Sequence, residues 1–192
     1  AVAARIPELV QGRIDVIAAN LGWTPERAEQ IAYSDSYYAA LQKAAAKQSS
    51  NFKSADELAG KRISSTKGST SEAAIKTKYP TATSVTFQDP PTAFLAMQQG
   101  KADAFVVSEM MLLKLKQQSE ATQPIDILEP QLADEKWGIG MRKGETALIN
   151  HVNATLQKME ASQEATALFN KWMGDQTEFK MKRGFKIEPI KG

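Results

Sequence analysis

An arginine stands in the first turn of a predicted helix, where a basic side chain is electrostatically unfavourable. The segment 24–27 (Thr-Pro-Glu-Arg) predicts a helix start, with the threonine as N-cap and the proline at the first position. Because a helix N-terminus favours anions, the Arg27 guanidinium opposes the helix dipole and should have an anionic partner. A carboxylate ligand suits it, since a guanidinium holds a carboxylate with two parallel hydrogen bonds. An ion pair with Glu26, Glu29 or Asp35 explains the pattern equally well.

A second candidate anion site is the turn 67–70 (Lys-Gly-Ser-Thr), between a predicted strand and a predicted helix. Gly68 permits close backbone approach, and Ser69 and Thr70 offer hydroxyls and N–H donors at a helix N-terminus. Ordinary capping of the helix by Ser69 or Thr70 is the alternative, and it is the better explanation of the turn taken alone. Neither candidate has the form of a phosphate loop, so a carboxylate suits both sites better.

Two segments of the chain, 11–17 (QGRIDVI) and 99–105 (QGKADAF), follow one plan. Each predicts a helix end, then Gln-Gly-base, one apolar residue, an aspartate and a buried strand. Asn20 and Ser108 are the next polar residues, each five positions after its aspartate. Two lobes built on one βαβ scheme explain this repeat, and ligands of such sheets bind beyond the carboxyl ends of the strands. We therefore expect Asn20 and Ser108 at equivalent strand ends, one in each lobe, facing a shared cleft.

Several kinds of chemistry find no support in the sequence. The lack of cysteine excludes disulfides, thiolate nucleophiles and cysteine-ligated zinc. The single histidine, His151, lies off the apolar stripe of its predicted helix, and we interpret it as a surface residue. No HExxH, GxSxG or phosphate-loop motif occurs. We therefore expect no catalytic residue, no metal and no cofactor, and a protein that is not an enzyme.

Charge and hydropathy argue against a nucleic-acid-binding protein and against a membrane-spanning one. The net charge of +2 is too small to make a nucleic-acid-binding surface the leading idea. The basic tail, residues 176–192, lacks interleaved aromatic residues, and we interpret it as solvated. No apolar run approaches the ~20 residues that span a bilayer, and no basic-then-apolar leader begins the sequence. We expect a soluble chain from which any export signal has been removed.

Strands that alternate with helices predict an α/β fold, with parallel sheets covered on both faces. The segment 39–47 alternates only weakly, and its three consecutive alanines leave a helix open there. The last predicted helix carries a core-facing stripe of Leu168, Phe169 and Trp172. Elsewhere the pattern predicts strands at 14–19, 62–65, 84–87, 102–107, 125–128 and 137–141, and helices at 71–79, 89–99, 110–117, 145–159 and 163–173.

Eight short segments carry a family resemblance through their order and spacing. They are 13–20, 24–27, 33–38, 58–62, 67–72, 100–106, 137–144 and 170–174. Each is a weak match alone, but together they resemble the polar amino-acid solute-binding proteins of ABC importers. This is family 3 of the bacterial extracellular solute-binding proteins, with the type II periplasmic binding protein fold. The resemblance extends from about residue 5 to residue 174.

The resemblance implies two α/β lobes joined by two crossing strands. Lobe 1 would consist of residues 1–39 and 133–192, and lobe 2 of residues 40–132. The family begins with a strand, a helix and a strand that have no counterpart here, so lobe 1 would be incomplete. We expect its open edge to be filled by a second chain, by a swapped copy or by residues outside this sequence.

The resemblance also implies a function: capture of an amino acid or related carboxylate between the lobes, for delivery to the membrane subunits of an ABC importer. The location would be the periplasm, or the cell exterior with a lipid anchor in a Gram-positive host. Arg27 would hold the ligand α-carboxylate, helped by the 69–70 turn and the backbone near Gly22. Trp23 either stacks over the ligand or packs between loop and helix. The predicted ligand-binding residues are Asn20, Gly22, Trp23, Arg27, Thr66, Ser69, Thr70 and Ser108.

The chain departs from the family at Ser108, where an aspartate usually pairs with the ligand ammonium. A buried ammonium that meets only a hydroxyl is poorly compensated, so the ligand lacks an α-amino group or another acid serves. One alternative function is an enzyme of the cyclohexadienyl dehydratase type on the same fold, which needs a cleft acid as proton donor. Glu109 is the only acid near the expected site, and strand alternation points it away. A ligand-sensing receptor domain is a third alternative.

Overall fold

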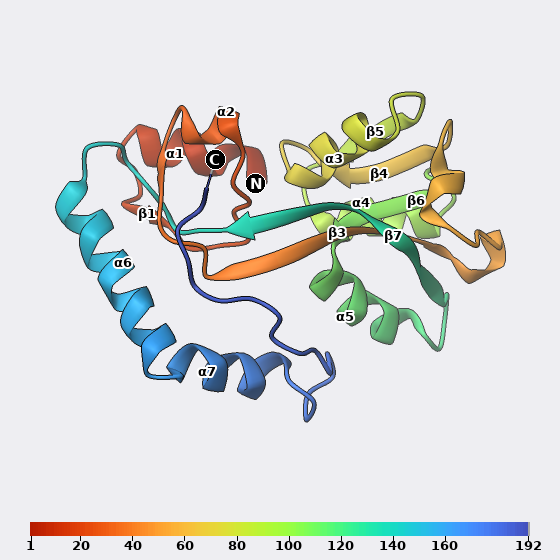
Figure 1. Ribbon diagram of the computed structural model, residues 1–192. Helices are drawn as coiled ribbons and strands as arrows, with labels where there is room; N and C mark the ends of the chain where they lie inside the picture. The colour runs from red at the N-terminus through yellow and green to blue at the C-terminus, as the bar shows by residue number, and fades with distance from the viewer. Residues whose placement is uncertain (192) are drawn as a thin grey trace. The chain divides into compact units, whose positions relative to one another are not determined.

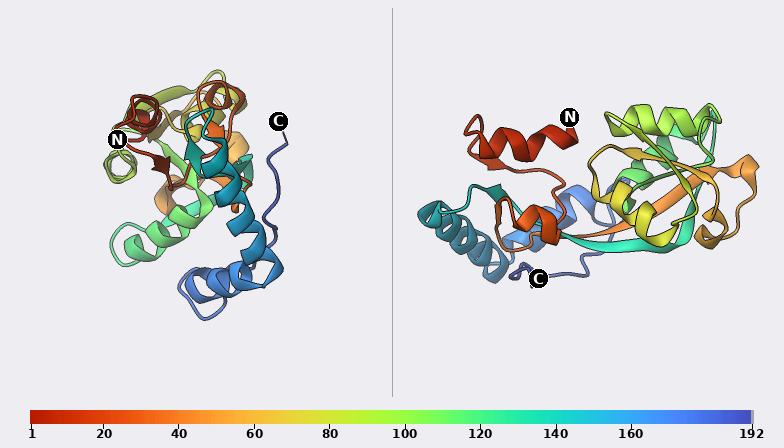
Figure 2. Two further views of the ribbon diagram at one scale, coloured as in Figure 1. Left: turned by 90° about the vertical axis from the view of Figure 1, so that its left-hand side faces the viewer. Right: turned by 90° about the horizontal axis from the view of Figure 1, so that it is seen from above.

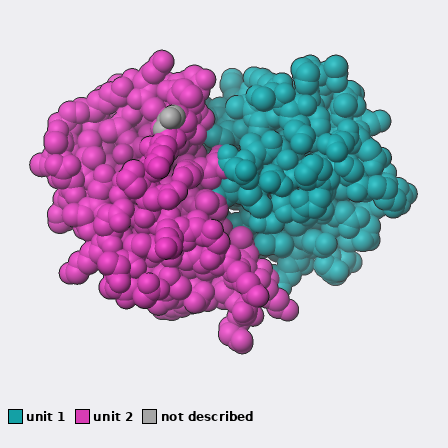
Figure 3. Space-filling view, viewed as in Figure 1, with its two compact units in different colours: residues 1–3, 40–134 teal, residues 4–39, 135–192 magenta. Residues whose placement is uncertain are grey.

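The computed structural model describes residues 1–191, which form two compact units. Among these residues, unit 1 consists of 1–3 and 40–134, and unit 2 of 4–39 and 135–191 (Figure 3). The chain therefore passes between the units three times, near residues 3–4, 39–40 and 134–135. The strands predicted at 14–19 and 102–107 belong to different sheets, one in each unit.

Unit 1 is built on a five-stranded mixed sheet in the order β5-β4-β6-β3-β7 (Figure 1). Strand β4 pairs in parallel with both β5 and β6, whereas β3 pairs with β6 in the antiparallel sense. The predicted parallel arrangement therefore holds only for β5, β4 and β6. The strands are β3 (Tyr38–Lys47), β4 (Arg62–Thr66), β5 (Thr83–Phe87), β6 (Ala104–Ser108) and β7 (Ile125–Trp137).

Helices cover both faces of this sheet, and the alanine-rich segment 39–47 forms one of its strands, β3. Ala44 and Ala46 face one hydrophobic cluster, which includes Ile75 of α3, while Ala45 faces a second cluster with Phe94 of α4 and Leu112 of α5. Small side chains allow both helical layers to approach this strand closely, so the helix left open there does not form. The helices of unit 1 are η2 (Gln48–Ser50), η3 (Ala55–Leu58), α3 (Thr70–Lys78), α4 (Pro90–Gln98) and α5 (Glu109–Ser119).

Strand β7 continues to Trp137, well beyond the strand predicted at 125–128, and the strand predicted at 137–141 is found as the end of β7 and as β8 (Gly140–Met141). Pro130 lies in the middle of β7, and a proline cannot donate a hydrogen bond to a neighbouring strand. In the sheet order β7 is an edge strand, where the missing N–H costs little. The proline is therefore compatible with a continuous strand at this edge of the sheet.

Unit 2 contains a three-stranded sheet in the order β1-β8-β2, and both pairings are antiparallel. Its core is formed by Leu9, Ile17, Leu21 and Ile31. The expectation of parallel pairing does not hold for these strands. The strands are β1 (Val16–Ile17), β2 (Ala32–Tyr33) and β8 (Gly140–Met141). The helices of unit 2 are α1 (Arg5–Val10), α2 (Pro25–Ala28), α6 (Thr146–Ala161) and α7 (Glu164–Met173), and the short helix η1 (Val2–Ala4) lies at the boundary between the units in the sequence. Figure 2 shows α6 and α7 as consecutive helices that meet at a marked angle.

The buried strand predicted at 14–19 is wrong in both length and burial. Only two residues pair with β8, and the side chains of Ile14 and Val16 are exposed. Arg142 explains the shortening, because its guanidinium donates to the Ile14 carbonyl at 2.8 Å and to the Asp15 carboxylate at 3.0 Å. A side chain thus satisfies backbone that a ladder would otherwise pair.

Two expectations for the C-terminal region also fail. The tail is not a solvated segment: Ile187 is buried, and Phe185 lies against Tyr38 and Phe169. Conversely, the side chain of Trp172, expected to face the core, is 65% exposed. Within residues 1–191, no helix combines the length and apolar character needed to cross a membrane.

Candidate functional site

Arg27 lies where the sequence predicts it, in the first turn of α2. The Thr24 hydroxyl accepts the Arg27 backbone N–H at 3.3 Å, which confirms the N-cap. The half-buried guanidinium donates from Nη1 to the Gly22 carbonyl at 2.7 Å, and the Tyr33 hydroxyl donates to the same oxygen at 3.0 Å. One of the acids considered as its ion-pair partner, Asp35, accepts a hydrogen bond from Gln157 at 2.6 Å. These contacts aim Arg27 at the loop that precedes α2.

Arg5 is a second guanidinium at this loop, and no sequence pattern predicted it. Its Nη1 donates to the Asn20 carbonyl at 3.3 Å, two residues from the carbonyl that Arg27 binds. Burial, and then the positive charge of Arg27, lower the pKa of Arg5. An anion beside Arg5 would relieve both the repulsion from Arg27 and the cost of burying the Arg5 charge. This arrangement in unit 2 can bind a carboxylate.

The remaining unit 2 candidates have mixed surroundings. Asn20 is exposed, whereas Gly22 is buried and forms an isolated antiparallel bridge with Trp137. The Trp23 backbone N–H donates to the Lys136 carbonyl at 2.9 Å. Its side chain borders a hollow of about 390 Å³ with Tyr33 and Ile190, which fits the packing alternative for this tryptophan.

The 67–70 turn in unit 1 is closed by hydrogen bonds of its own. The Ser69 hydroxyl accepts the Glu72 N–H at 3.2 Å and donates to the Thr66 carbonyl at 2.6 Å. The Gly68 N–H donates to the Glu72 carboxylate at 2.8 Å. Ser69 therefore caps α3, as the alternative held, and the Glu72 carboxylate takes up one donor that an external anion would use. Thr66 is buried at the end of β4, and Thr70 is partly exposed.

Ser108 is buried at the carboxyl end of β6, and its hydroxyl has no hydrogen-bond partner among the described residues. Such an orphaned polar group costs about 1–3 kcal/mol, so it needs a water or ligand atom to bind. In the β3–β6 register Ser108 lies opposite Gln42, whose Oε1 accepts a hydrogen bond from the Ser71 hydroxyl at 2.6 Å. The Ser65 hydroxyl is buried and unpartnered in the same way.

Strand alternation places these polar groups on one face of the sheet. Ser65 shares a face with Ile63, and Ser108 shares a face with Val106; both apolar residues belong to the cluster against α3. Two buried serines, a buried glutamine and a serine of α3 thus gather at the carboxyl ends of β4 and β6, and none of them is ionisable. Gln42, Ser65 and Ser71 were missed because only the pairing of β3 with β6 and the packing of α3 bring them to Ser108.

Glu109 points to the opposite face, as the alternation predicts. Its carboxylate accepts a hydrogen bond from Lys43 Nζ at 2.8 Å, and Lys43 also pairs with Glu129. Burial alone would lower the pKa of Lys43, but the two carboxylates outweigh it and raise that pKa. Glu109 is thus an ion-pair partner of a buried lysine on the face opposite Ser108.

The described residues hold no cluster for a metal. Within residues 1–191, no group of three or more histidine or acidic side chains is arranged to bind an ion. His151 is exposed on α6.

Unit 2 carries the basic loop and unit 1 the neutral polar strand end, and the chain has the type II periplasmic binding protein fold. The model of the bacterial extracellular solute-binding proteins, family 3, matches residues 1–175, so the chain belongs to this family. The resemblance stated from the sequence is thereby confirmed.

The relatives are named as binding proteins. The ABC transporter glutamine-binding protein GlnH of Bacillus subtilis is 33% identical over 170 residues, which cover 88% of this chain and 61% of GlnH. A putative ABC transporter arginine-binding protein of Escherichia coli is 28% identical, covering 87% of this chain and 69% of the relative. The chain thus spans about three fifths of the length of GlnH.

Solved structures agree in fold. An ancestral arginine-binding protein bound to arginine superposes with a TM-score of 0.83 at 30% identity, covering 90% of this chain and 77% of that one. The ancestral amino acid-binding protein AncCDT-1, described as a precursor of cyclohexadienyl dehydratase, gives a TM-score of 0.80 at 28% identity, covering 90% and 74%.

Proposed function

We propose that this chain is the ligand-binding portion of the substrate-binding component of an ABC importer, and that its ligand is an amino acid or a closely related carboxylate. The observation that carries this proposal is the pair of guanidiniums, Arg5 and Arg27, held at neighbouring carbonyls of one loop. Their mutual repulsion suits a carboxylate better than a neutral group. The names of the relatives, which include glutamine- and arginine-binding proteins, support the same ligand class.

The ligand-binding residues proposed in unit 2 are Arg27, Gly22, Asn20 and Trp23, joined by Arg5. In unit 1 we propose Ser108, Thr66 and Thr70, joined by Gln42, while Ser69 acts through the turn that it caps. Because the unit 1 groups are uncharged, they favour ligand atoms that need hydrogen bonds rather than a counter-charge. An amide side chain satisfies this requirement, and so does a ligand without an α-amino group.

The partners and location follow from the same proposal. The chain would deliver its ligand to the membrane subunits of the importer, in the periplasm or, with a lipid anchor, at the surface of a Gram-positive cell. Another polypeptide segment would pair with the free edge of β1, where Val16 is 40% exposed. The greater length of GlnH, of which the chain covers 61%, is consistent with such a segment.

The test of the binding function is direct. We expect denaturation of the purified protein to release an amino acid or carboxylate that mass spectrometry identifies. Isothermal titration should then give matching binding of that compound, with L-glutamine, L-arginine and their deaminated analogues as the comparison panel. Failure of every member of the panel and of the released compound to bind would refute the proposal.

The dehydratase alternative has one observation in its favour, the likeness to AncCDT-1. That protein is itself described as amino acid-binding, and Glu109 is held by Lys43 rather than directed to the face of Ser108. We therefore propose that the chain is not an enzyme. Turnover of prephenate by the purified protein would overturn this.

A further inference from the structure

Residues 176–191 lie beyond the part of the chain that the family model matches, yet they pack closely against unit 2. Along residues 181–187 the side chains alternate. Met181, Arg183, Phe185 and Ile187 are buried or half-buried, whereas Lys182 and Lys186 are exposed. This is the pattern of an extended segment with one face against the protein. The segment therefore binds through specific side chains.

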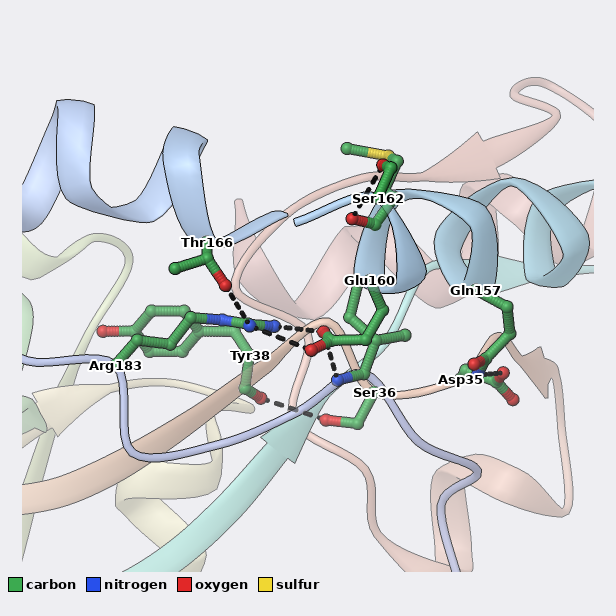
Figure 4. Close-up of polar contacts among 10 residues, drawn as sticks. Asp35, Ser36, Tyr38, Gln157, Glu160, Ser162, Thr166 and Arg183 are labelled. Carbon is green, nitrogen blue, oxygen red and sulfur yellow. Dashed lines mark hydrogen bonds and ion pairs between the residues drawn. The ribbon is translucent and has the colours of Figure 1, made fainter. Parts of the chain in front are cut away.

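The first anchor is an ion pair between Arg183 and Glu160 at the end of α6 (Figure 4). The exposed fractions of the two side chains are only 8% and 17%. Arg183 also donates to the Thr166 hydroxyl at 3.0 Å, and the Ile187 backbone N–H donates to the Glu160 carboxylate at 2.9 Å. One carboxylate thus binds two points of the tail, and its pKa is lowered, first of all by the hydrogen bond from Arg183.

The second anchor is aromatic. The ring of Phe185 lies 5.0 Å from that of Tyr38 and 5.7 Å from that of Phe169, measured between centroids. On its other side Tyr38 stacks on Trp137 at 4.7 Å. The Arg183 guanidinium lies 4.9 Å from the centre of the Phe185 ring, which links the aromatic anchor to the first.

The third anchor is a short piece of backbone pairing. The Ser36 N–H donates to the Glu188 carbonyl at 2.8 Å, and the Glu188 N–H donates back at 3.4 Å. The Glu188 carboxylate forms an ion pair with Lys136. The tail therefore touches residues 36–38 and 136–137 together.

Residues 36–38 lie just before the point where the chain leaves unit 2, and residues 136–137 lie just after the point where it re-enters unit 2. Tyr38 begins β3 and Trp137 ends β7, while the division between units falls at 39–40 and 134–135. The Tyr37 N–H donates to the Trp137 carbonyl at 3.0 Å and joins the two regions directly.

We propose that residues 183–188 form a strap that clamps the unit 2 ends of both crossing strands to α6 and α7. The strap holds residues 36–38 and 136–137 as part of unit 2, so that within the two crossing strands any bending between the units is confined to 39–40 and 134–135. The role in bending rests on the proposed binding function, whereas the clamping itself does not.

Hydrogen exchange of single amides in the full chain tests the clamp. The Tyr37 amide is the reporter because it bonds to Trp137 and not to the tail, and the Lys67 amide, bonded to Phe87 in unit 1, is the reference. Arg183→Gln should speed Tyr37 exchange about tenfold or more, since it leaves Glu160 buried without its partner, and should leave Lys67 unchanged. The matched control, Lys182→Gln, removes the same charge from an exposed neighbour and should alter neither amide.

Unchanged Tyr37 exchange in Arg183→Gln, or equal acceleration at Tyr37 and Lys67, would overturn the proposal. If Arg183→Gln does not fold, Phe185→Leu takes its place, because it removes the ring contact with Tyr38 and keeps an apolar side chain. It should give the same pattern with a smaller acceleration. In a second measurement, the titration of L-glutamine and L-arginine, the strap variants should change the affinity of whichever binds by about threefold or more, while Lys182→Gln should not. If neither amino acid binds, the compound released on denaturation takes their place in this titration; if that too fails, the binding proposal fails while the exchange result still decides the strap.

Discussion

Replacing Ser108 with alanine should stabilise the unliganded protein, which is unusual for a change at a buried polar residue. The Ser108 side chain is 3% exposed, and its hydroxyl has no hydrogen-bond partner within the described chain. Alanine removes the orphaned oxygen and changes the volume little. Relief of the desolvation penalty is about 1 kcal/mol or more. For a chain of this length, each kcal/mol corresponds to about 2–4 °C in Tm.

Ser64→Ala provides the matched control. Ser64 is fully buried on the neighbouring strand, but its hydroxyl lies 2.9 Å from the Ala93 carbonyl and 3.1 Å from the Ala104 carbonyl. Its removal should therefore destabilise the protein by about 1 kcal/mol. Scanning calorimetry of ligand-free wild type and both variants measures the two opposite shifts.

Ser108→Ala should also weaken ligand binding. If the ligand satisfies the Ser108 hydroxyl, its loss removes one hydrogen bond, or about 0.5–1.5 kcal/mol, which titration calorimetry reports as about a two- to tenfold lower affinity. A Ser108→Ala variant that is more stable without ligand but binds ligand more weakly would show that the Ser108 hydroxyl serves binding rather than stability. A loss of apo stability equal to that of Ser64→Ala would refute the reasoning, because it would mean that the hydroxyl is already satisfied.

Four further predictions follow from the site and the core. Ser108→Asp should tighten binding of a ligand whose ammonium reaches this point and weaken binding of one that presents a carboxylate or apolar group; no change in any affinity would place Ser108 outside the site. Arg27→Ala should weaken binding at least about tenfold while changing the apo Tm little, as titration and calorimetry will report. The pKa of Lys43 is raised above 10.5 in the fold, so the stability from its ion pairs should be complete below that pH and lost as the pH rises through the folded value. Comparing the alkaline fall in Tm of wild type with that of Lys43→Met checks this. Finally, if another segment completes β1, a sharply folded monomer with the mass of this sequence alone should not be found by native mass spectrometry.

Local patterns were enough to predict several features of the site. The N-cap at Thr24, the opposed faces of Ser108 and Glu109, and the strand–turn–helix around Ser69 all depend on residues within a few positions of one another. The solute-binding family was recognisable for a related reason, since it depends on the order of short segments rather than on contacts between them.

Features that depend on contacts distant in sequence were not predictable. Arg5 joins Arg27 only because α1 packs beside the 20–22 loop, and Gln42 reaches Ser108 only through the pairing of β3 with β6. The tail was misjudged because its charge run concealed an alternation in which Arg183 turns inward to Glu160. The shortening of β1 depended on Arg142, more than 120 residues further along the chain.

Under the proposed function, the two hydrogen bonds to the Gly22 carbonyl should favour rapid ligand association. Because it accepts hydrogen bonds from both Arg27 and Tyr33, its two lone pairs are occupied and the loop is held from two sides. If a carboxylate binds here as proposed, it meets donors that are already oriented and spends little ordering free energy on this half of its encounter. Association should then approach the rates of electrostatically steered encounters and slow as ionic strength rises, while discrimination among ligands resides in how fast each one leaves.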